Sequence, residues 1–165
     1  MLATLAFEAR DCARVVEVLA PWADPAPGAR WQLGVCQYES GKWAQAAAQF
    51  TALLRLREHA PTRYNLALAQ WQLRDYRAAA ATLERAAEPD ARRLLATVHQ
   101  AAGDVPRAVA VLQQAMEGFP TDERFVVDLA VLCFEHGNYP LGIEVAEAGT
   151  RRHPESAQLR VLLGV

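Results

Sequence analysis

Cysteine can form disulfides, and both cysteine and histidine can bind metal ions such as zinc. Both residue types are widely spaced in this 165-residue chain. The three cysteines, Cys12, Cys36 and Cys133, are odd in number and include no Cys-x-x-Cys pair. Cys133 and His136 could share a helix face, but two ligands do not complete a zinc site. We therefore expect neither a disulfide framework nor a metal site, and we interpret Cys133 as a core residue and His136 as a surface residue.

Motifs for nucleophilic or metal-assisted catalysis are missing from the sequence. It has no Gly-x-Ser-x-Gly, no phosphate-binding glycine loop and no His-Glu-x-x-His. Carboxylates such as Asp75, Asp104 and Asp122 fall at expected turns or helix starts, where capping explains them. We expect no enzyme activity, no catalytic residues and no cofactor.

Charge and hydropathy narrow the classes of partner. The net charge of −2 gives no bulk reason to bind nucleic acid or an anionic membrane. No run of 18 apolar residues is present, so we expect no membrane-spanning helix. The N-terminus lacks the basic region of a secretory signal, which favours a cytoplasmic location. The Ala- and Arg-rich, Lys-poor composition is typical of a bacterial protein with a GC-rich gene.

The helices expected to position the candidate side chains can be predicted from a sequence repeat. A leucine followed by a small residue recurs at intervals of 33, 29, 34 and 34 residues, as Leu33-Gly34, Leu66-Ala67, Leu95-Ala96, Leu129-Ala130 and Leu163-Gly164. In residues 27–59, apolar residues lie three and four apart, stop at Ser40-Gly41 and resume at Trp43. This pattern predicts an amphipathic helix, a glycine turn and a second amphipathic helix. A period near 34 residues indicates stacked helix–turn–helix units.

The best-matched unit carries Leu33-Gly34, Tyr38, Gly41, Trp43, Ala46 and Phe50, and its spacing resembles that of the tetratricopeptide repeat (TPR) family. The resemblance covers the whole chain as one array, with a partial unit, four complete units and a second partial unit at residues 1–26, 27–59, 60–88, 89–122, 123–156 and 157–165. It implies an all-α fold, a right-handed superhelical α-solenoid of antiparallel helix pairs. Arg74 replaces the turn glycine of the third unit, and Pro89 comes early, so we expect a shortened second helix there.

The resemblance also implies a concave groove lined by the first helix of each unit. Its residues lie two before, two after and five after the repeat leucine, and the candidates are Trp31, Val35, Tyr38, Tyr64, Leu68, Trp71, Arg93, Thr97, Gln100, Val127 and Val131. Aromatic residues dominate interface energetics, so this face suits an apolar segment with an acidic group near Arg93. Packing inside the repeat is favoured for Tyr38, Trp71 and Phe134, whereas exposure in the groove is favoured for Trp31 and Tyr64.

We interpret the chain as a non-catalytic scaffold that binds a peptide segment of a partner protein. One alternative is a self-assembling module, because Val161, Leu162 and Leu163 give the last helix an apolar face where an array normally ends in a polar one. The incomplete terminal units would then pack on another copy, as a homo-oligomer, or belong to a longer repeat protein. A small chaperone of a secretion system is a further alternative.

Overall fold

A computed structural model describes residues 2–22 and 24–164, with the side chain of Leu2 left aside. These residues form eleven α-helices and no strand, which confirms the expected all-α class. The chain divides into two compact units, Met1–Ala86 and Ala87–Val165, and each is described by itself.

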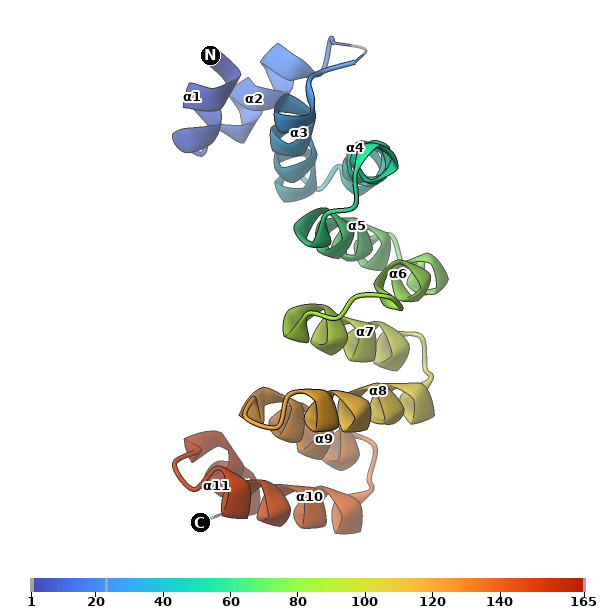
Figure 1. The fold of residues 1–165 in the computed structure, drawn as a ribbon, viewed down its shortest axis with the longest axis vertical. Coiled ribbons are helices and arrows are strands. Elements are labelled where there is room, and N and C mark those ends of the chain that lie inside the picture. Colours follow the sequence, from blue (N-terminus) through green and yellow to red (C-terminus); the bar gives the residue numbers. More distant parts are fainter. Residues whose placement is uncertain (1, 23, 165) are drawn as a thin grey trace. The chain divides into compact units, whose positions relative to one another are not determined.

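Unit 1 is a stack of helix pairs (Figure 1). From α1 to α6, successive helices of the unit pack against one another, and α3 also contacts both α1 and α5. The second helix of the third repeat has 8 residues where its counterpart α4 has 14, which confirms the expected shortening. The helices of the unit are α1 (Leu2–Glu8), α2 (Cys12–Leu19), α3 (Pro27–Glu39), α4 (Trp43–Leu56), α5 (Ala60–Gln72) and α6 (Tyr76–Leu83).

Unit 2 has the same construction, and α9 packs against α8, α10 and α11. Its core is formed by residues of successive helices, among them Leu112 from α8 and Phe125 and Leu129 from α9. Stacked helix pairs of this kind define an α-solenoid. The helices are α7 (Pro89–Ala101), α8 (Val105–Gly118), α9 (Glu123–Glu135), α10 (Tyr139–Arg152) and α11 (Ala157–Leu163).

The turn between the two helices of a repeat has one conformation throughout. A residue with positive φ lies two positions after the first helix, at Arg10, Gly41, Arg74, Gly103 and Gly137. The amide that follows it donates to a carbonyl five residues earlier, as from Asp104 to His99 at 2.8 Å, which closes the helix end in a Schellman-type turn. In four of the five turns this next residue is Asp or Asn, and its side chain accepts from the first turn of the second helix.

Small residues allow the two helices of a repeat to cross closely. Ala46, Ala79 and Ala108 share one position in successive repeats, and each is fully buried. Gly142 holds that position in the last complete repeat, where an added Cβ would lie 2.7 Å from Cε1 of Phe134. Phe134 therefore packs against α10, which is the packing role that the sequence left open.

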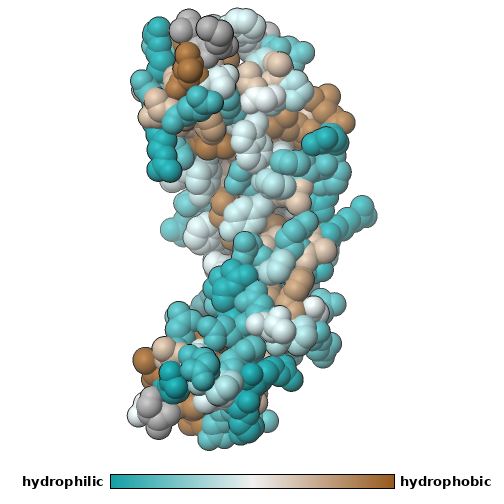
Figure 2. All heavy atoms as spheres, turned by 60° about the vertical axis from the view of Figure 1, so that its left-hand side comes forward, coloured by the Kyte–Doolittle hydropathy of each residue, from teal (hydrophilic) through white to brown (hydrophobic). Residues whose placement is uncertain are grey.

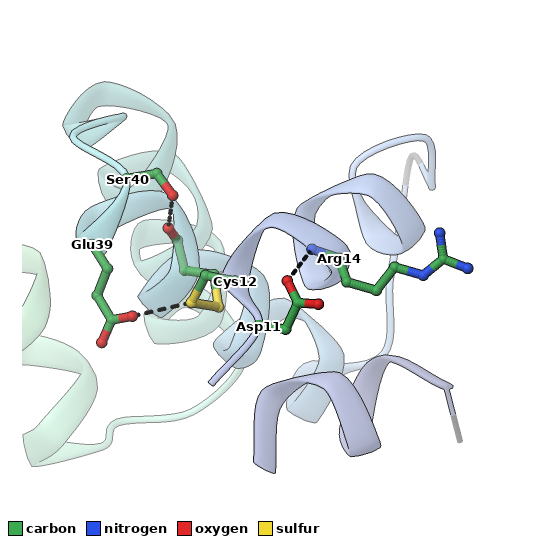
Figure 3. Close-up of a disulfide and its surroundings, with 6 residues drawn as sticks. Asp11, Cys12, Arg14, Glu39 and Ser40 are labelled. Carbon is green, nitrogen blue, oxygen red and sulfur yellow. Dashed lines mark hydrogen bonds between the residues drawn. A yellow bond between two sulfur atoms is a disulfide. The ribbon is translucent and has the colours of Figure 1, made fainter. Parts of the chain in front are cut away.

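A disulfide joins Cys12, the first residue of α2, to Cys36 in α3 (Figure 3). The expectation that no disulfide forms is therefore wrong. The sequence separation of 24 residues conceals the pairing, because it is the packing of α2 against α3 after the loop between them that brings the two Cα atoms to 4.8 Å. Cys133 is buried and free, burial raises the pKa of its thiol, and His136 is exposed, so the interpretation of that pair is confirmed.

Candidate partner-binding site

Trp31 is half-buried on α3 and packs against the core of unit 1. Its ring centroid lies 5.6 Å from that of Phe50 and 5.8 Å from that of His59, with both rings edge-on. Aromatic pairs of this geometry add about 0.5–1.5 kcal/mol to the burial of their area. Trp31 is consequently held in one orientation rather than free to rotate.

A pocket of about 500 Å³ opens beside Trp31, between the start of α3, the end of α4 and the start of α5. Most of its wall is apolar, and Leu56 at its rim is 67% exposed. Concave apolar sites with a few polar groups are typical binding sites. The residues that line it are Pro27, Gly28, Trp31, Leu53, Leu56, Arg57, His59 and Thr62.

The polar groups at this pocket carry a net positive charge. No carboxylate of the described residues forms an ion pair with Arg57, whereas the neighbouring Glu58 accepts a 3.1 Å hydrogen bond from Arg63. The Nδ1 atom of His59 lies 2.8 Å from the hydroxyl of Thr62, which fixes the imidazole beside Trp31. The start of α5 has no acidic residue in its first turn and no side-chain cap. An acidic group would complement this pocket.

The other candidate groove residues of unit 1 are half-buried: Val35, Tyr38, Tyr64, Leu68 and Trp71. Val35 and Tyr38 pack against the core that contains Phe50 and Leu66. The hydroxyl of Tyr38 accepts a long hydrogen bond, 3.4 Å, from Gln72 on α5. Tyr38 thus contributes to the stacking of α3 on α5, and only part of its ring is available to a ligand.

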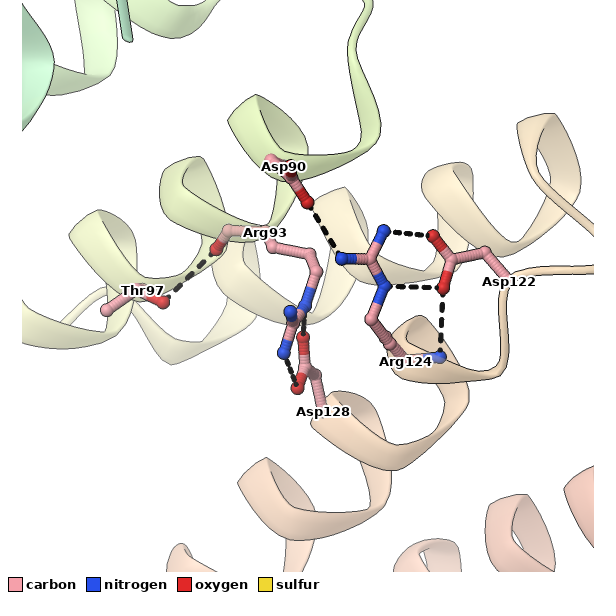
Figure 4. Close-up of polar contacts among 6 residues, drawn as sticks. All are labelled: Asp90, Arg93, Thr97, Asp122, Arg124 and Asp128. Carbon is pink, nitrogen blue, oxygen red and sulfur yellow. Dashed lines mark hydrogen bonds and ion pairs between the residues drawn. The ribbon is translucent and has the colours of Figure 1, made fainter. Parts of the chain in front are cut away.

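In unit 2 the predicted groove residues of α7 are already hydrogen-bonded within the protein (Figure 4). Arg93 donates from Nε and Nη2 to the Asp128 carboxylate of α9, the second bond at 2.9 Å, and this pairing raises the pKa of Arg93 above its ordinary value. Thr97 donates to the carbonyl of Arg93, and Gln100 donates to Glu135 at 2.8 Å. An acidic group of a partner would have to compete with Asp128 for Arg93.

Val127 and Val131 lie at a second, apolar pocket of unit 2, formed by α9 and α11, with a volume of about 380 Å³. Val161 on its rim is 76% exposed. On the face drawn in Figure 2, apolar side chains reach the surface in separate patches, including one at the lower end, where α10 and α11 lie. Of the predicted residues, Trp31 therefore lines the first pocket and Val127 and Val131 line the second. Arg93, Thr97 and Gln100 form polar contacts within unit 2, and the rest line neither pocket.

Sequence reasoning missed the contribution of the second helix and the loop after it. Leu53 and Leu56 come from the end of α4, and Arg57 and His59 come from the loop between α4 and α5. A signal was present, because the apolar pattern of α4 runs to its last residue and a basic residue follows it. The exposure of Leu56 could not be predicted, since it depends on where α5 begins.

Comparison with known proteins agrees with this architecture. Two family models described as tetratricopeptide repeat match the chain, one at residues 99–164 and the other at residues 32–92 and 64–123. The helix pairs and their turns define a helical repeat protein. The chain belongs to the tetratricopeptide repeat family.

Solved structures of TPR proteins superpose on the chain, all with low sequence identity. A crystal structure of MamA has a TM-score of 0.75 and 16% identity, and the match covers 96% of this chain and 98% of that one. MamA residues 41 to the end from Desulfovibrio magneticus RS-1 gives 0.72 and 16%, with 94% and 93% covered. YrrB, described as a TPR protein with an unusual peptide-binding site, gives 0.67 and 16%, with 99% and 89% covered. These similarities establish a shared fold.

No curated protein matches the sequence. None of the helices within residues 2–22 and 24–164 is long and apolar enough to cross a membrane.

Proposed function

We propose that this protein is a non-catalytic scaffold that binds a segment of a partner protein along the first helix of each repeat, with the pocket beside Trp31 as the main anchoring site. The observation that carries the proposal is that pocket in unit 1, with an oriented tryptophan and an exposed leucine at its rim. Its arginine, Arg57, forms no ion pair with any of the residues that the structure describes. Buried aromatic and arginine side chains are the usual centres of binding energy at protein interfaces.

The chemistry of the pocket favours a partner segment with a large apolar side chain next to an acidic residue. The apolar side chain would contact Trp31, Leu53 and Leu56, and the carboxylate would lie near Arg57. A peptide-binding site described for YrrB, a protein of the same fold, supports peptide binding as the mode. Arg93 remains a proposed contact, but its pairing with Asp128 makes it secondary to Arg57.

The test is a matched pair of surface substitutions in unit 1. Leu56 and Leu73 are both exposed leucines at helix ends, and only Leu56 lines the pocket. A partner captured with the wild-type protein would be titrated against Leu56→Ser and Leu73→Ser. Loss of an anchor contact costs about 1 kcal/mol or more, so Leu56→Ser should weaken affinity by about fivefold or more. Equal affinities for the two variants would show that the pocket is not the site.

Self-association is a second candidate, because α11 exposes an apolar face. Val161 is 76% exposed next to the pocket formed with Val127 and Val131. If two copies pack through this face, sedimentation velocity should show mass increasing with concentration, and Val161→Glu should abolish the increase. A wild-type protein that stays monomeric at all concentrations would exclude this candidate.

A further inference from the structure

Two cysteines and one carboxylate converge where α2 meets α3. Cys36 and Glu39 are three residues apart on one face of α3, and Cys12 begins α2 opposite them (Figure 3). One ligand atom from each residue lies within 4.8 Å of the other two. Among the described residues, only these three His, Cys, Asp or Glu side chains converge in this way.

The disulfide does not account for the short contact between the Glu39 carboxylate and the Cys12 sulfur. Oε2 of Glu39 lies 3.0 Å from Sγ of Cys12. A disulfide sulfur has no proton to donate, so the disulfide does not explain why the carboxylate faces this atom. A thiol could donate to it, and a cation could be shared by both groups. The position of Glu39 therefore suits the reduced form of the pair.

Burial and charge show what the reduced form would bind. Cys36 is fully buried, Cys12 is half-buried and Glu39 is exposed, so a ligand would reach the site from the side of Glu39. Cys12 lies at the N-terminus of α2, where the helix dipole favours an anionic thiolate. Two thiolates and a carboxylate carry three negative charges, and thiolates prefer soft or borderline divalent cations.

We propose that the reduced Cys12–Cys36 pair, together with Glu39, binds one zinc-class divalent ion, and that disulfide formation closes this site. Two sulfur ligands and one oxygen ligand leave the fourth tetrahedral position to water, so the ion should exchange more readily than in a four-ligand structural site. The ion would hold α2 on α3 in the reduced protein, as the disulfide does in the oxidised protein.

The interconversion balances with a small-molecule disulfide such as oxidised glutathione as the oxidant. The two zinc-bound thiolates and one oxidised glutathione, with two protons taken up, give the Cys12–Cys36 disulfide, two reduced glutathione molecules and a free zinc ion. Thiols persist in reducing compartments and disulfides in oxidising ones. The redox state of the compartment therefore determines whether the metal-binding thiol form or the disulfide form is present.

The experiment uses the whole chain, reduced and then kept free of oxygen, with Co²⁺ as a spectroscopic probe. The wild-type protein should bind one Co²⁺ per chain, with a thiolate-to-cobalt charge-transfer band that Zn²⁺ abolishes by displacement. The same protein oxidised with glutathione disulfide should show no such band. Cys133→Ser is the matched control, because Cys133 is the other cysteine and lies in unit 2, and it should bind as the wild type does.

Two further variants distinguish a metal site from a simple thiol pair. Cys12→Ser should lose the charge-transfer band, and Glu39→Gln should bind at least about tenfold more weakly while still forming the disulfide. Cys12 is half-buried and Glu39 is exposed, and circular dichroism would check that each variant folds. Absence of the band in the reduced wild type, or unchanged binding in Cys12→Ser or Glu39→Gln, would overturn the proposal.

Discussion

At the scale of single residues, the turn inside each repeat depends on a left-handed backbone conformation. Gly41, Gly103 and Gly137 adopt it without cost, whereas Arg10 and Arg74 adopt it with φ of 57° and 59°. A residue with a Cβ pays roughly 1 kcal/mol there. Arg74 is thus a point of local strain in the third repeat.

Replacing Arg74 with glycine should relieve that strain. Arg74 is exposed and forms no ion pair with the described residues, so little else is lost. We expect Arg74→Gly to raise the free energy of unfolding by up to about 1 kcal/mol, measured by urea denaturation. Gly103→Ala, which places a Cβ at the equivalent turn of unit 2, should lower it. A destabilised Arg74→Gly would show that its side chain has a role that the structure does not reveal.

At the scale of elements, caps and cross-helix contacts hold each helix in place. Asp122 caps α9 through the backbone amide of Arg124 and also accepts from the side chain of Arg124, which in turn donates to Asp90 on α7 at 2.8 Å. The hydrogen bonds from the side chain and the backbone amide of Arg124 lower the pKa of the Asp122 carboxyl below its ordinary value. A lowered folded-state pKa contributes stability above the unfolded pKa, and this contribution is lost as the pH falls through the folded pKa.

Asp122→Ala should therefore destabilise unit 2 by about 1 kcal/mol at neutral pH. The difference from wild type should begin to shrink once the pH falls below about 3.9, the ordinary value for an aspartate, because the unfolded chain then takes up a proton there, and it should be lost as the pH falls through the lowered pKa of the folded Asp122. Denaturation at a series of pH values measures both effects. A difference that stays constant down to acid pH would mean that the charge of Asp122 does not contribute.

The Cys12–Cys36 disulfide ties the α1–α2 pair to α3. In the chain-entropy account, closing a loop of this size stabilises the folded state by about 3 kcal/mol. Reduction in the presence of a chelator should thus speed amide hydrogen exchange in α1 and α2 and leave unit 2 unchanged. The Cys12→Ser variant should show fast exchange with or without reductant. Equal protection of α1 and α2 in the oxidised protein and in the reduced, chelator-treated wild-type protein would contradict this account.

The helices could be predicted from the sequence because their boundaries are local. Pro27 and Pro89 open α3 and α7, and the turns follow Gly41, Gly103 and Gly137. The tertiary pairings could not be predicted in the same way. Arg93 and Asp128 are 35 residues apart, one repeat later, so their contact depends on how α7 stacks beside α9. The Trp31–His59 contact and the disulfide likewise depend on how helices of unit 1 pack against one another.

At the scale of the whole molecule, the repeat builds two compact units, and the division follows the short helix α6. Each unit has its own core and its own surface features: an aromatic pocket in unit 1, and an arginine–carboxylate cluster with an apolar pocket in unit 2. The expected single groove from residue 31 to residue 131 remains a prediction. The proposed function depends on unit 1.

The most direct test of that function is amide chemical-shift mapping of the labelled whole chain during titration with a captured partner. We predict that the largest changes fall at the start of α3, the end of α4 and the start of α5, around Trp31, Leu56, Arg57 and His59. Changes confined to unit 2, or to α1 and α2, with none around Trp31, would contradict the claim that this pocket anchors the partner.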